Sequence, residues 1–213
     1  MDFVRSDTRR YTQLPRFFRW FSAHCVLRRL DESDAYRVAQ ALSRPGHRRG
    51  SNGNLPRHPN QAEAFVRSAQ ADWLAGSRYV LAVTRKQTQE FVGWTELRSA
   101  GPQRWMLGWF VQPELAARPL AREIVLAAAD LMFTALNAQA LYAECPFGNV
   151  SIEQLLTDAG FIEMIPAGSL DPANGRPRLS GLFELGRSDW ETLRRTRLLP
   201  TALGSQHQPL ALV

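Results

Sequence analysis

Residues 111–124, VQPELAARPLAREI, combine backbone features that suit the binding of a phosphate group. The stretch runs from the end of a predicted strand through a short loop into an apolar helix that we expect to begin at Pro119. The start of a helix presents unpaired N–H groups and about half a positive charge, which favours a diphosphate. We therefore expect the amides of Leu120, Ala121 and Arg122 to point toward such a ligand.

Pro119 weakens this expected site, because proline has no N–H to donate. One missing charge-assisted hydrogen bond costs roughly 1.5–3 kcal/mol, or about one to two decades in affinity. Proline is nevertheless favoured at the first position of a helix, and Arg118 and Arg122 would add positive charge. The stretch is also compatible with a plain strand–loop–helix junction that binds no phosphate.

The cysteines and histidines do not form a recognisable reactive group. Cys25 and Cys145 have no partner at metal-ligand spacing, and two cysteines are too few for a disulfide framework. None of the four histidines has a serine or cysteine and an acid placed around it in a triad pattern. We expect buried, reduced thiols, no metal site and no hydrolase triad.

The net charge of +6 and the isoelectric point of about 10.1 come almost entirely from arginine, since Lys86 is the only lysine. Guanidinium groups bind phosphate, so nucleic acid is a possible but less favoured partner. No run approaches the roughly 18 apolar residues needed to cross a bilayer. Arginines interrupt the N-terminal residues 1–22, which therefore lack the core of a secretion signal, and we expect a cytoplasmic protein.

The organisation of the chain is predicted as a basic, aromatic arm (1–22), one folded domain (23–197) and a loose or partner-bound tail (198–213). The arm contains LPRFFRWFSAH (14–24), which is compatible with a short amphipathic helix or with aromatic residues that pack on the domain. Residues 44–60 are rich in Pro, Gly, Asn and Arg and are predicted as a loop.

Hydrophobic periodicity predicts seven strands and five helices in the order β α α β β β α β α β β α. The fold class is therefore α/β (α+β), with a mixed, mostly antiparallel sheet of about seven strands and helices on both faces. The second helix should bury Ala64, Phe65, Ala69 and Trp73. The predicted strands are 25–30, 79–85, 90–98, 104–111, 140–145, 161–165 and 178–186, and the helices are 34–43, 60–76, 119–137, 150–160 and 188–195.

This order resembles the GCN5-related N-acetyltransferase (GNAT) fold, and local motifs resemble its RimJ/RimL-like branch over about residues 25–194. The matching features are the turn at the end of the fourth strand, the entry into the following helix, and an Asn eleven residues before a Gly-Phe pair. Val111, Pro113 and Glu114 match the turn, Ala121 and Glu123 match the helix entry, and Asn149, Gly160 and Phe161 match the last feature. In addition, FELGRSDWETL resembles the family's closing segment.

The resemblance implies acetyl-CoA, or another acyl-CoA, as co-substrate and a primary amine of a protein N-terminus or small molecule as acceptor. Its pantetheine arm would lie between strands 104–111 and 140–145. The family's phosphate loop differs here, because Ala116 replaces a basic or amide residue and Pro119 replaces a glycine. The residues expected to contact the co-substrate are Phe110, Val111, Arg118, Leu120, Ala121, Arg122 and Asn149.

Acetyl transfer needs a base that leaves the amine neutral and an acid that protonates the departing thiolate. Glu96 and Glu144 are the acidic candidates near the expected cleft, and Asn149 matches a position that contacts the cofactor or orients the acceptor. The tyrosine that many relatives use as general acid has no counterpart in residues 146–160. A catalytically impaired binding or regulatory protein on the same fold is the alternative. A homodimer is compatible with either interpretation.

Overall fold

The computed structural model describes residues 12–44, 51–52, 56, 58–115, 118–170, 176–177 and 179–196, with the backbone alone for Ser51, Asn52 and Arg118. The expectations for most of the 44–60 segment, for residues 1–11 of the arm and for the 198–213 tail lie outside these residues. No helix in the described ranges is both long and apolar enough to cross a membrane.

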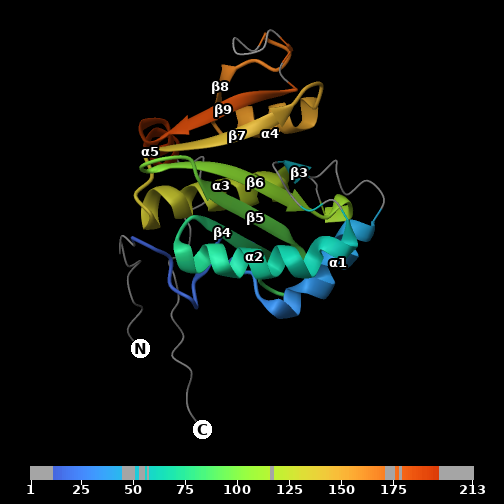
Figure 1. Ribbon diagram of the computed structural model, residues 1–213. Helices are drawn as coiled ribbons and strands as arrows, with labels where there is room; N and C mark the ends of the chain where they lie inside the picture. Colours follow the sequence, from blue (N-terminus) through green and yellow to red (C-terminus); the bar gives the residue numbers. More distant parts are fainter. Residues whose placement is uncertain are drawn as a thin grey trace, which may run out of the picture.

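One continuous mixed sheet forms the centre of the molecule, with the strand order β1-β2-β4-β5-β6-β7-β9-β8 (Figure 1). All neighbours are antiparallel except β6 and β7, and a short strand, β3, pairs with β6. The strands are β1 (Arg19–Phe21), β2 (Cys25–Arg29), β3 (Ser51–Asn52), β4 (Arg78–Arg85), β5 (Phe91–Ser99), β6 (Arg104–Val111), β7 (Ala140–Pro146), β8 (Ile162–Ile165) and β9 (Ser180–Gly186).

The helices cover both faces of this sheet, as predicted. In Figure 1, α1 and α2 lie against β4–β6 on one face, and α3 lies behind the same strands on the other. The side chains of α4 and α5 join the core on the α3 face. The α-helices are α1 (Ala35–Ser43), α2 (Ala62–Ala75), α3 (Arg118–Ala135), α4 (Val150–Asp158) and α5 (Arg187–Arg195); the 3-10 turns are η1 (Glu32–Asp34), η3 (Pro59–Gln61) and η4 (Pro113–Leu115).

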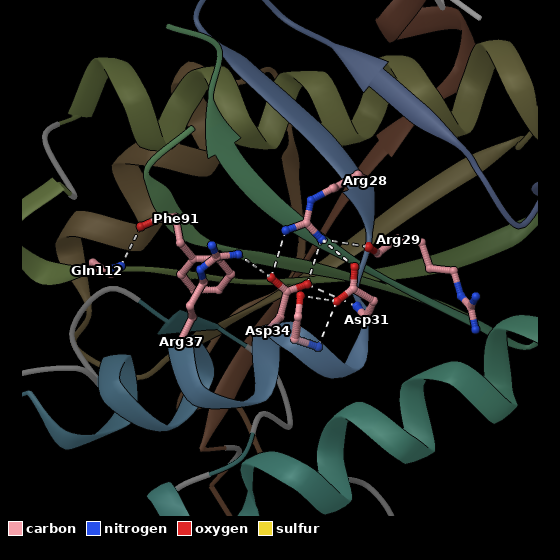
Figure 2. Close-up of polar contacts among 8 residues, drawn as sticks. Arg28, Arg29, Asp31, Asp34, Arg37, Phe91 and Gln112 are labelled. Carbon is pink, nitrogen blue, oxygen red and sulfur yellow. Dashed lines mark hydrogen bonds and ion pairs between the residues drawn. The ribbon is translucent and has the colours of Figure 1, made fainter. Parts of the chain in front are cut away.

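A buried charge network fixes the start of the α1 segment (Figure 2). Asp31 caps the 3-10 turn η1 and accepts a hydrogen bond from the amide of Ser33. The fully buried Asp34 accepts from both terminal nitrogens of Arg28, at 2.7 and 2.8 Å, and also pairs with Arg37 at 3.2 Å. Burial alone would raise the pKa of Asp34, but the hydrogen bonds from Arg28 and from the Asp31 amide outweigh it and lower the pKa.

The N-terminal segment corrects one prediction. The amphipathic-helix interpretation of residues 14–24 is wrong, because Arg19–Phe21 form β1, which pairs antiparallel with β2. Phe18 and Trp20 are buried and stack on each other, whereas Phe17 is 85% exposed. Pairing with β2 and burial of the aromatic rings therefore outweigh local helix periodicity, and the alternative of aromatic packing on the domain is confirmed.

Three other differences are smaller. The predicted 44–60 loop contains β3 and ends in η3, so with β1 the sheet has nine strands rather than about seven. On α2, Phe65, Ala69 and Trp73 are buried as predicted, but Ala64 is exposed and Ala62 and Val66 are buried instead. The face of α2 that packs on the sheet is thus rotated slightly from the expected face. Asn149 caps α4, and Gly160 follows it with φ +88°, as predicted for a helix end.

Candidate functional site

The parallel pair of strands at the centre of the sheet stops pairing partway along β6, and we call the strand edges beyond that point the slot. β6 and β7 are paired from Arg104↔Ala140 to Leu107↔Ala143, and β6 then continues to Val111 without further pairing to β7. On its other side, β6 stays paired with β5 as far as Val111. These are the two strands, predicted at 104–111 and 140–145, between which the resemblance implies the pantetheine arm.

Backbone alternation decides which residues of β6 face the slot. Gln112 donates its amide to Val92 on the β5 side, whereas the carbonyl of Gln103 accepts from Gln139 at the start of β7. Because backbone polar groups alternate along a strand, the N–H and C=O groups of Trp109 and Val111 face the slot. Trp109 was not among the predicted site residues, because only the register identifies it.

Phe110, which the resemblance implies as a co-substrate contact, has its backbone groups on the β5 edge of β6. By the same alternation its backbone groups face β5, and its ring is buried against Trp94 with centroids 4.3 Å apart. Val111 keeps its slot-facing backbone, although its side chain is buried in the core on the α3 face. The backbone of Val111 and Trp109, rather than Phe110, therefore offers polar groups to a ligand in the slot.

A short segment of the chain itself occupies part of the slot edge. β3 pairs antiparallel with β6, with Ser51 opposite Phe110 and Asn52 opposite Trp109. Since β5 already occupies the other edge of these residues, β3 lies on the edge that faces the slot. Figure 1 shows β3 beside the end of β6 on the side of β7.

The start of α3 lies after the end of β6, as predicted, but the helix begins at Arg118 rather than Pro119. Pro119 is thus the second helical residue, still within the first turn where proline is tolerated. In any α-helix the amides of the first three helical residues have no acceptor within the helix, and here the second of them is a proline without an N–H. Of the three predicted donors, only Leu120 lies among these first three residues, so general helix geometry favours it over Ala121 and Arg122.

The side chains of this first turn divide between packing and polar contacts. Leu120 packs on the core and Ala121 is buried. The Nε of Arg122 donates to the carbonyl oxygen of Asp158 at the end of α4, at 3.1 Å. The predicted role of the Arg118 side chain, like that of Ala116, lies outside the described part of the chain.

A pocket of about 480 Å³ adjoins the first turns of α3. The turn between β1 and β2, the exposed side of α3 and the end of α4 line it. The lining includes Ala23, His24, Pro119, Arg122, Leu155 and Asp158. The pocket combines an apolar surface with charged residues of both signs, because Glu123 and Asp158 line it together with Arg122.

Glu123 fixes one wall of this pocket. Its carboxylate accepts from the hydroxyl of Ser22 at 2.5 Å and from the His24 amide at 2.6 Å, and its other oxygen lies 2.8 Å from Nδ1 of His24. Burial would raise the pKa of Glu123, but these hydrogen bonds outweigh it and lower the pKa. The β1–β2 turn is therefore tied to α3 by an ionised carboxylate.

Glu96 is buried on the α2 face of the sheet. It lies opposite Gly108 of β6, with Oε2 3.7 Å from the Arg78 guanidinium, which also pairs with Asp72 at 2.8 Å. Burial raises the pKa of Glu96, and Arg78 offsets this only in part. The same Oε2 is a buried oxygen without a hydrogen-bond partner in the described structure.

Glu144 lies on the other side of Gly108 and is exposed. It is the first residue of β7 beyond the last pair with β6, so it stands at the opening of the slot. Its side chain points to the same face of the sheet as that of Glu96, because both alternate with residues buried on the α3 face.

Asn149 is held at the start of α4. Its side-chain oxygen accepts from the amide of Ile152 at 3.2 Å, and its carbonyl oxygen accepts from the Cys145 thiol at 3.6 Å. Asn149 therefore stands close after the end of β7, as predicted. Burial raises the pKa of the Cys145 thiol to about 11 and that of Cys25 to about 12, so neither is a thiolate nucleophile at neutral pH.

The central mixed sheet, with one parallel pair of strands and helices on both faces, defines an α/β fold. Residues 24–162 match the Acetyltransferase (GNAT) domain family. The chain belongs to this family, and the predicted family and fold are confirmed.

Solved structures of similar fold share little sequence with the chain. A GCN5-related N-acetyltransferase from Brucella melitensis has a TM-score of 0.69 at 18% identity, and the match covers 88% of both chains. The ribosomal-protein-S5-alanine acetyltransferase from Vibrio fischeri has a TM-score of 0.66 at 18% identity, with 81% of this chain and 98% of that one covered. Its presence agrees with the RimJ/RimL-like resemblance.

A chimera of the spermidine N-acetyltransferase SpeG from Vibrio cholerae and hSSAT has a TM-score of 0.64 at 18% identity, covering 78% of this chain and 98% of that one. No curated protein matches the sequence. These similarities establish the fold that the chain shares with acetyltransferases of different acceptors.

Proposed function

We propose that the protein is an acyl-CoA-dependent N-acyltransferase that transfers an acetyl group to a primary amine. Membership of the GNAT family supports the reaction type. The observation that carries the proposal is the slot between β6 and β7, with the backbone of Trp109 and Val111 on one side and the start of α3 at its end.

The chemistry of acetyl-CoA fits this slot. The pantetheine arm is extended and carries two amides, which suit pairing with an open strand edge. The antiparallel pairing of β3 on this edge supports the fit, because β3 is itself an extended, amide-bearing chain. The diphosphate would lie at the free amide of Leu120, and the pocket beside Pro119 has room for part of the nucleotide.

The transfer forms a bond between the amine nitrogen and the acetyl carbonyl carbon and breaks the carbon–sulfur bond. The amine loses a proton to a base, and the departing thiolate takes up a proton. We assign the base to Glu144, directly or through one water, because it is exposed at the opening of the slot. Glu96 is a weaker candidate because it is buried beneath α2 beside Arg78.

The acceptor is proposed to be a protein N-terminus or a small amine. Both classes occur among structures that share the fold, which include a ribosomal-protein-alanine and a spermidine acetyltransferase. The two cysteines that the structure leaves free and buried fit a reducing compartment, and we place the reaction in the cytoplasm.

Titration calorimetry with acetyl-CoA tests the proposal. We expect saturable binding that Arg118→Ala weakens, followed by acetyl transfer to at least one member of a panel of peptide N-termini and polyamines. Folded protein that gives no heat at millimolar acetyl-CoA would favour the alternative, an impaired binding protein on the GNAT fold.

A further inference from the structure

The strand β3 pairs with the part of β6 to which the co-substrate would bind. Beyond Leu107, β6 has lost β7 as a partner, and its slot-facing groups belong to Trp109 and Val111. Asn52 of β3 stands directly opposite Trp109. Trp109 has a single N–H and a single C=O, and both point to the slot edge. A second extended chain therefore cannot pair with Trp109 while β3 does.

An ion pair holds the segment before β3 close to the end of β6. Arg44 at the end of α1 lies 3.0 Å from the carboxylate of Glu114, in the turn that follows β6. Because this ion pair joins the end of α1 to the end of β6, it raises the effective concentration of β3 at the slot edge.

The pairing is nevertheless small enough to be displaced. β3 has two residues, and only Asn52 faces slot-directed backbone groups of β6. In the described residues, β3 pairs with β6 alone, and no further strand pairs with its other edge. A ligand that offers two amides, a thioester carbonyl and a diphosphate can make more contacts than this strand does.

We propose that β3 is a built-in competitor of acyl-CoA: it occupies the backbone edge at Trp109 in the free protein and leaves when the co-substrate binds. This inference rests on the proposed function, since it needs acyl-CoA to use the same edge. It makes β3 a regulator of affinity for the co-substrate, so that anything that draws β3 away from β6 raises the affinity.

The test compares Asn52→Pro with Asn52→Ala in the full chain. Proline removes the backbone N–H that pairing with Trp109 requires, whereas alanine keeps it. Calorimetry should give Asn52→Pro about a tenfold lower Kd for acetyl-CoA, the factor expected if roughly one molecule in ten has the edge open. Asn52→Ala should bind like the unchanged protein, and thermal melting checks that all three chains are folded.

Amide hydrogen exchange at Trp109 without ligand separates the two ideas. Asn52→Pro should speed this exchange at least about tenfold if β3 protects the edge. Equal Kd values for the three chains would overturn competition while leaving the proposed function standing. Faster exchange with no acetyl-CoA binding in any chain would overturn the proposed function, and the competition with it. Unchanged exchange would overturn the pairing itself.

Discussion

The two flanks of β6 have opposite characters. On the β5 flank, pairing is continuous to Val111, and the side chains above it, Trp94 and Glu96, are buried beneath α2. On the β7 flank, pairing stops at Leu107, and the exposed Glu144 and the short β3 follow. A strand that one side holds rigidly can offer its other edge to a ligand without losing its position. Changes on the first flank should therefore affect stability, and changes on the second should affect function.

The largest effect is expected from Trp94→Ala on the β5 flank. Trp94 is fully buried and stacks on Phe110, so its removal leaves a large cavity. We predict a loss of about 3–5 kcal/mol in the free energy of unfolding, measured by urea denaturation. Trp94→Phe keeps a stacked ring and should lose less. An unfolding free energy that stays within 1 kcal/mol in the alanine variant, on the order of one hydrogen bond, would contradict the division between the flanks.

Glu144→Gln on the β7 flank should have the next largest effect, and this effect should be on the rate of acetyl transfer rather than on stability. Removal of a general base typically lowers the rate about 100-fold or more, and we predict such a fall in kcat/KM with little change in the Kd for acetyl-CoA. Glu184→Gln is the matched control, because Glu184 stands on the neighbouring strand β9 and points to the same face. Equal losses in the two variants would remove Glu144 from its assigned role.

Pro119→Gly tests the end of the slot. Glycine restores an N–H in the first turn of α3, and one regained hydrogen bond to a charged group should lower the Kd for acetyl-CoA about tenfold. The measurement is calorimetry at a single ionic strength, with desulfo-CoA as a check that the gain does not depend on the thioester. A Kd that stays the same or rises would show that this position does not face the diphosphate.

Glu96→Gln should have the smallest effect, on the order of one hydrogen bond or about 1 kcal/mol in stability. The pKa of Glu96 is raised in the folded protein, so the folded state binds its proton more tightly than the unfolded chain does. The unchanged protein thus loses stability relative to the variant as the pH rises from 4.5, the ordinary pKa of a glutamate, through the higher pKa of Glu96 in the folded protein. Arg78 keeps Asp72 as a partner in the variant.

Unfolding curves at several pH values measure this difference between the two chains. We expect the variant to gain on the unchanged protein as pH rises, and acetyl transfer to change less than in Glu144→Gln. A variant that loses stability relative to the unchanged protein at neutral pH would mean that the pairing of Glu96 with Arg78 outweighs the cost of burying the charge.

Much of the fold could be predicted from the sequence, because it depends on local patterns. Alternating and continuous apolar runs located β4, β5 and β6, and Asn149 and Gly160 marked both ends of α4. β1 and β3 were missed for a different reason. Each is only two or three residues long and is defined by its partner strand rather than by its own composition.

The site was less predictable than the fold. The positions of Glu144 in β7 and of Leu120 in the first turn of α3 follow from element boundaries, so the sequence could locate both, while their roles stay predictions. It could not decide that Phe110 turns to β5 while Trp109 turns to the slot, since a shift of one residue exchanges the two. Nor could it place Glu96 beside Arg78, because that contact depends on how α2 packs on the sheet.

A crystal structure of the protein with acetyl-CoA would test the central claim most directly. Our account predicts that the pantetheine arm lies between β6 and β7 with its amides paired to Trp109 and Val111, and that Asn52 no longer stands opposite Trp109. A complex in which β3 keeps its place on β6 while acetyl-CoA binds elsewhere would contradict it.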